Sequence, residues 1–181
     1  LRDNPPKTLA VDLETDYPDP VGGTITCVSL AMEYDKAFII PWNAQYLEDH
    51  GSDLEPLLEY QVVYDRLKEA LEAQVGVVMH NSPFDARLLR REEINVPVHD
   101  DTLLMHYALD ERTTSQGLKS IARHLLGVAD WETDIKQYLP NKQAPYTLIP
   151  PDVLYPYAGR DSCYTLILRD KLRNRLDSED N

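Results

Sequence analysis

The chain has 181 residues, of which 43% are apolar and 27% charged, and a formal net charge of −13; these values predict one globular domain with a sizeable core. We expect no signal peptide. No apolar run approaches the roughly 18–20 residues of a membrane-spanning helix, so we also expect no membrane partner. An acidic protein repels nucleic acid at long range, which excludes a general coat protein but not an enzyme that holds phosphates through bound cations.

The N-terminal segments predict an antiparallel meander of three strands. The strands are expected at 9–16, 24–32 and 37–42, and the first two are separated by a turn rich in proline and glycine. Residues 43–59 are polar and acidic without a clear period, and they predict a surface loop.

From residue 62 onward, helical and strand patterns alternate. A helix is expected at 62–73, a buried parallel strand at 75–81 and a second helix at 82–93. A short strand running into a helix follows over 96–109, and another helix at 117–127. The chain continues with an irregular arm containing a short helix over 128–151 and a last helix from 151 or 152 to about 176. Strands followed by strand–helix alternation predict a single mixed α/β domain over residues 1–181.

Two cysteines, Cys27 and Cys163, lie far apart in apolar segments. The favoured interpretation is two buried thiols in a reducing compartment, with a disulfide as the alternative. We therefore expect a cytoplasmic, non-secreted protein. The first residue is Leu1 and not methionine, so we expect a piece of a longer chain that is monomeric as a fragment.

Two acids lie inside the first predicted strand, and Asp16 stands at its last position. Asp12 and Glu14 point to the same face because side chains alternate along a strand, whereas Val11 and Leu13 point to the other face. Two carboxylates aimed at one place repel each other, and a bound cation is the usual remedy. The alternative is a strand end with two solvated acids.

The segment HNSPFDARLL holds a third acid. Ser82 and Asp85 form a capping-box pattern, with Pro83 at the first helical position. The functional alternative places Asp85 at a helix start after a buried strand, where α/β proteins build sites. Asn81 would contact substrate or brace the turn, and His80 is expected to form a local hydrogen bond.

The last predicted helix carries Tyr157 and Asp161, which share one face because they are four residues apart. A surface Tyr–Asp pair is the alternative. Taken together, the order Asp-x-Glu, Asn-x-x-x-Asp, Tyr-x-x-x-Asp resembles the DEDD exonucleases of the tyrosine subclass. In the histidine subclass a histidine precedes the last aspartate by five, where this chain has Pro156. The resemblance covers residues 7–172 and is greatest to the proofreading domain of family A DNA polymerases.

The resemblance implies an α/β, ribonuclease H-like fold, which is a mixed five-stranded sheet flanked by helices. It implies two divalent ions, Mg²⁺ or Mn²⁺, held by Asp12, Glu14, Asp85 and Asp161. Tyr157 would orient the attacking water, and Thr15 and Asn81 would contact the terminal nucleotide. The implied reaction removes nucleoside 5′-monophosphates from single-stranded or frayed DNA 3′ ends, beside a polymerase domain of the same parent chain.

Three alternatives to this interpretation remain. RNase D-like and repair exonucleases share the tyrosine subclass and act on RNA or DNA 3′ ends, although the arm over 128–151 and the pattern over 98–127 favour the polymerase-linked type. A catalytically silent scaffold domain and an unrelated acidic α/β domain are the others. Basic residues expected near the site are few, namely Arg87, Arg160 and Lys119.

Overall fold

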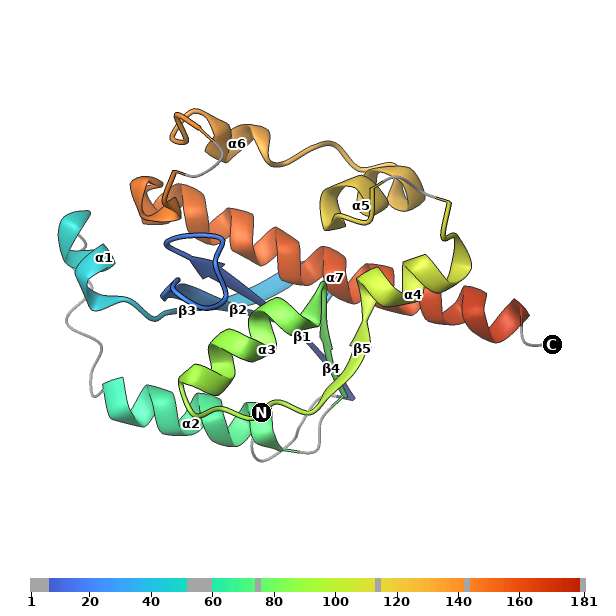
Figure 1. Ribbon diagram of the computed structural model, residues 1–181, viewed down its shortest axis with the longest axis horizontal. Coiled ribbons are helices and arrows are strands. Elements are labelled where there is room, and N and C mark those ends of the chain that lie inside the picture. Colours follow the sequence, from blue (N-terminus) through green and yellow to red (C-terminus); the bar gives the residue numbers. More distant parts are fainter. Residues whose placement is uncertain (1–6, 52–59, 74–75, 113–114, 142–143, 180–181) are drawn as a thin grey trace.

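The computed structural model describes residues 7–51, 60–73, 76–112, 115–141 and 144–179. Its centre is a five-stranded sheet in the order β3-β2-β1-β4-β5 (Figure 1). The strands are β1 Thr8–Thr15, β2 Ile25–Glu33, β3 Lys36–Pro41, β4 Gly76–Met79 and β5 Val98–Asp101. The β1–β2 and β2–β3 pairs are antiparallel, whereas β1–β4 and β4–β5 are parallel. The predicted mixed five-stranded sheet is therefore confirmed.

Helices cover both faces of this sheet. They are α1 Ala44–Asp49, α2 Tyr60–Glu72, α3 Ser82–Arg91, α4 Thr102–Leu109, α5 Leu118–Leu126, α6 Thr133–Lys136, the 3₁₀ turn η1 Tyr146–Leu148 and α7 Pro151–Glu179. Helices α2 and α3 pack on one face, and the long helix α7 crosses the other, with α5 and α6 on its outer side (Figure 1). Among the helices within the described ranges, none has the length and apolar character to cross a membrane.

The two faces of β1 are used differently. Val11 and Leu13 are buried in the cluster formed with Leu67 of α2 and Leu88 of α3. Each such buried side chain stabilises the fold by about 1.5–3 kcal/mol relative to exposure. The opposite face begins with Ala10, whose small side chain lets α7 pack close to the strand. The period-2 alternation thus turns Asp12 and Glu14 to the same face as Ala10, toward α7.

The predicted loop over 43–59 is wrong at residues 44–49, which form α1. The Asn43 side chain caps this helix by accepting a hydrogen bond from the Tyr46 backbone amide at 3.1 Å. Tyr46 and Leu47 are buried, so two apolar anchors hold a segment whose composition is otherwise polar. Residues 52–59 of the predicted loop lie outside the described residues.

Of the two alternatives for the start of α3, the structure does not show the capping box. Asn81, not Ser82, is the residue before the helix, and it adopts a left-handed conformation with φ 62° and ψ 51° without a side-chain cap. The carboxylate of Asp101 instead accepts the backbone amides of Asn81, Ser82 and Leu103, at 3.0, 2.7 and 2.9 Å. The Asp101 carboxylate at the end of β5 therefore satisfies the amides at the start of α3, and Asp85 is not needed as a cap.

The arm predicted over 128–151 contains the expected short helix, α6. It is not loosely attached, because Trp131, Ile135 and Ile149 are buried in one cluster with Leu154 and Leu168 of α7. The Tyr146 amide donates to the Asp16 carbonyl at 2.9 Å, which joins the arm to the end of β1. Both cysteines are free thiols, as expected. The expected burial is confirmed for Cys27 only, because Cys163 is half-buried.

Candidate active site

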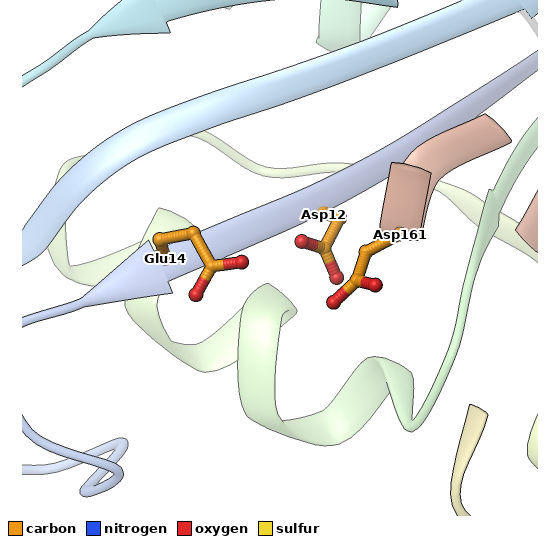
Figure 2. Close-up of side chains that lie close together, drawn as sticks. All are labelled: Asp12, Glu14 and Asp161. Carbon is orange, nitrogen blue, oxygen red and sulfur yellow. The ribbon is translucent and has the colours of Figure 1, made fainter. Parts of the chain in front are cut away.

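Three of the four predicted acids converge between β1 and α7. Asp12 and Glu14 come from β1 and Asp161 from α7, and one carboxylate oxygen of each lies within 4.8 Å of the others. Figure 2 shows their carboxylates turned into the same space. The Ser162 hydroxyl lies 2.6 Å from that of Ser29, and this hydrogen bond fixes α7 over β2 beside the acids.

Burial makes this concentration of charge costly. Burial first, and then the charges of Asp161 and Glu14, raise the pKa of Asp12 well above its usual range. Burial and Asp161 raise the pKa of Glu14 in the same way. The Oδ2 atom of Asp12 is buried and has no hydrogen-bond partner in the described part of the chain. An unpartnered buried oxygen costs free energy, and a bound cation would remove that cost.

Asp85 lies beside the cluster but outside it. The residue is in the first turn of α3, and its Oδ1 accepts the Leu13 backbone amide at 3.1 Å. Burial raises the pKa of Asp85 to about 8, with smaller contributions from Asp101 and Asp161 and with backbone hydrogen bonds opposing. The charge of Asp85 in turn helps to raise the pKa of Asp12, so the two carboxyl groups lie near each other.

Both carboxylate oxygens of Asp161 have partners. The Trp131 indole Nε1 donates to Oδ1 at 2.6 Å, and the Lys119 ammonium forms an ion pair with Oδ2. Burial acts to lower the pKa of Lys119, but Asp161, Asp12 and Glu14 act against it and the net shift is upward. Of the basic residues expected near the site, Lys119 is at its centre, Arg160 pairs with the exposed Asp134, and Arg87 is exposed.

Tyr157 lies one helical turn before Asp161 and is only 3% exposed. Its ring packs edge-on against Tyr146 of the arm at 6.4 Å, and the Lys119 ammonium lies 4.6 Å from its centre. Burial first, and then the charge of Asp161, raise the pKa of Tyr157 well above its usual range. The phenol therefore stays protonated at neutral pH and can position a group but not act as a base.

The two predicted substrate contacts differ in their surroundings. The Thr15 hydroxyl donates to the Tyr17 carbonyl at 2.7 Å, so its proton is used within the turn after β1. Asn81 is exposed at the start of α3, and its side chain makes no capping bond. His80 forms a hydrogen bond, with Nδ1 2.8 Å from the Thr102 hydroxyl, but this partner is 22 residues away and the bond is not the local one expected.

Sequence reasoning missed two residues that support the site. Trp131 lies 30 positions before Asp161, in an arm without a regular period, and only the tertiary fold brings them together. Asp101 showed a local signal, because an Asp-Thr pair before an apolar run is typical of a helix start. Its longer-range bonds to Asn81 and Ser82 had no such signal.

The acids present suit a hard divalent cation. Carboxylate oxygens are the ligands that Mg²⁺ and Mn²⁺ prefer. The convergence of three carboxylates and the unpartnered Oδ2 of Asp12 fit such an ion. The donor set of the cluster contains no histidine or cysteine, which is unlike the nitrogen and sulfur sites typical of zinc.

Sequence relatives of this chain are polymerases. It is 29% identical to DNA polymerase I of Chloroflexus aurantiacus over an alignment of 187 positions, covering 99% of this chain and 18% of the relative. It is 27% identical to the DNA polymerase of Escherichia phage T5 over 146 residues, covering 71% of this chain and 17% of the relative. The chain thus spans less than a fifth of either relative's length.

Solved structures with the same fold include nucleases. Brucella melitensis NrnC with bound Mg²⁺ superimposes with a TM-score of 0.66 at 19% identity, covering 96% of this chain and 75% of that one. Escherichia coli RNase D gives a TM-score of 0.65 at 17% identity, covering 96% and 40%. The family described as 3′-5′ exonuclease matches residues 2–177. The chain therefore belongs to the 3′-5′ exonuclease domains of the DNA polymerase A family.

Proposed function

We propose that this chain is the proofreading exonuclease domain of a DNA polymerase and removes nucleoside 5′-monophosphates from DNA 3′ ends. The observation that carries the proposal is the convergence of half-buried Asp12 with buried Glu14 and Asp161, each with one carboxylate oxygen within 4.8 Å of the others. Family membership supports the reaction class. Two polymerase relatives, of which the chain spans less than a fifth, support DNA as the substrate and a polymerase domain in the same parent chain as the partner.

The four acids have distinct tasks in this proposal. Asp12, Glu14 and Asp161 would hold one divalent ion, and Asp85 would join Asp12 in holding a second. Such ions supply Lewis acidity at the reacting phosphate and lower the pKa of a water. The chain itself supplies rigidity, since β1 fixes Asp12 and Glu14 and the Leu13 amide orients Asp85.

Tyr157 would hold the attacking water by its hydroxyl. The raised pKa of its phenol supports orientation over proton removal. Asn81, exposed at the start of α3, would reach the terminal nucleotide. Thr15 would contact it through its methyl group and backbone, because its hydroxyl proton is donated to Tyr17.

A frayed 3′ end is the expected form of the substrate. Glu14, Asp85 and Asp161 are buried and Asp12 is half-buried, so a terminal nucleotide must leave its stack to bring its phosphate to them. Unpairing a duplex end costs about a few kcal/mol and costs least at a mismatch. The site would thereby select mispaired termini without reading the base.

Rates on four 5′-labelled substrates with Mg²⁺ test this proposal. The substrates are single-stranded DNA, matched duplex, duplex with a mismatched 3′ end, and single-stranded RNA of the same sequence. We expect single-stranded and mismatched DNA to be shortened faster than matched duplex, and RNA to be the poorest substrate. Preference for RNA would favour the RNase D-like alternative, and absent shortening would favour a silent scaffold. Shortening that continues without a divalent metal would contradict the metal-dependent site.

A further inference from the structure

The two partners of Asp161 differ in kind. Trp131 is a neutral donor whose indole is buried, packs against Tyr164 with ring centres 4.4 Å apart, and donates to Oδ1 at 2.6 Å. Lys119 carries a full positive charge at the end of a flexible side chain and forms an ion pair with Oδ2 of Asp161. One oxygen is therefore held by a rigid group, and the other by a group that can leave.

The Lys119 ammonium lies where the negative charges converge. It forms its ion pair with an acid of the three-carboxylate cluster, and its charge also favours ionisation of Asp12 and Glu14. Its side chain is 19% exposed, so it has a route toward solvent. A divalent ion on the same Asp161 oxygen would meet this ammonium at contact distance, where like charges repel.

We propose that Lys119 is an internal counter-cation of the metal-free site, that metal binding replaces its ion pair with Asp161, and that Trp131 keeps its hydrogen bond and positions this carboxylate throughout. The inference rests on the metal-holding role given to Asp161 above. It predicts that loss of the Lys119 ammonium and loss of the Trp131 hydrogen bond change the metal affinity in opposite directions. Lys119 competes with the metal, whereas Trp131 supports it, because hydrogen bonds to a ligating carboxylate orient it for the ion.

Mn²⁺ titration calorimetry and metal-free melting temperatures of the purified chain separate these roles. Lys119→Gln is expected to melt at a lower temperature than wild type without metal but to bind Mn²⁺ about tenfold more tightly, because a like charge is gone. Trp131→Phe is expected to weaken Mn²⁺ binding about tenfold. Lys136→Gln removes the same charge from the exposed α6 surface, and its Mn²⁺ affinity should stay within about twofold of wild type because exposed charges are screened.

Unchanged or weaker Mn²⁺ binding by Lys119→Gln would overturn the inference while leaving the proposed function standing. Should that variant fail to fold, Lys119→Arg provides the second test. It retains the cation, so it should bind Mn²⁺ no more tightly than wild type, and tighter binding would contradict competition. Absence of Mn²⁺ binding by wild type would overturn both the inference and the metal-dependent function.

Discussion

Replacing Asp101 by alanine should destabilise the domain more than loss of an ordinary helix cap. The Asp101 carboxylate is buried and accepts three backbone amides, those of Asn81, Ser82 and Leu103. Hydrogen bonds to a charged group each contribute about 1.5–3 kcal/mol. Part of that total is offset because removing the carboxylate also removes a buried charge and lets water reach the amides. We expect a net loss of about 3 kcal/mol in the free energy of unfolding.

Urea unfolding of the metal-free protein measures this loss. Asn43→Ala is the matched control, since its side chain caps α1 through a single bond to the Tyr46 amide, and such a cap contributes about 1 kcal/mol. With an unchanged slope, the midpoint of Asp101→Ala should fall about three times as far as that of Asn43→Ala. A shift no larger than the control's would refute the view that Asp101 joins α3 and α4 to the end of β5.

Three further changes probe the site itself. Asp12→Ala should keep or raise the metal-free stability, by up to about 3 kcal/mol, because it relieves repulsion between like charges within 4.8 Å of one another. The variant should also lose the rise in melting temperature that Mn²⁺ gives the wild type. An equal rise in the variant and the wild type would place the ions elsewhere. Tyr157→Phe should slow 3′-nucleotide release roughly ten- to a thousandfold while keeping the Mn²⁺-induced melting shift, and loss of that shift would make the tyrosine a structural brace. In EDTA, the free energy of unfolding should fall as the pH rises from about 6.5 to 8. The pKa of Asp85 in the folded state is about 8, so over this window the folded state binds more protons than the unfolded state and loses stability as pH rises. His80, whose pKa burial lowers to about 4, is already neutral there, and a rise in stability over this window would contradict the assignment.

The sheet was predictable because its signals are local. β-branched runs and the alternation around Asp12 and Glu14 decide both the strands and the face that each acid takes. The convergence of Asp161 with these acids followed from the family resemblance and not from periodicity. Its position four residues after Tyr157 placed both on one face of α7 but did not show what that face contacts.

What could not be predicted depends on contacts distant in sequence. Ser82 and Asp85 have the local pattern of a capping box, yet the Asp101 carboxylate takes the amides and Asp85 turns to the Leu13 amide. The local capping-box preference is overridden because the Asp101 carboxylate at the end of β5 is a charged acceptor for these amides. The Trp131 contact to Asp161 spans 30 residues of the chain, and its arm has no period that would reveal the docking.

The most direct test of the central claim, that the acids beneath α7 form a metal-dependent 3′→5′ exonuclease site, is release of a labelled 3′-terminal nucleotide from single-stranded DNA. Wild type should release nucleoside 5′-monophosphate with Mg²⁺ and none with EDTA. Asp12→Ala and Asp161→Ala, each lacking an acid of the cluster, should be slower by at least about a hundredfold, since a metal ligand supplies several kcal/mol of transition-state stabilisation. Near-normal release by either folded variant, or cutting of a circular strand by wild type, would contradict the claim.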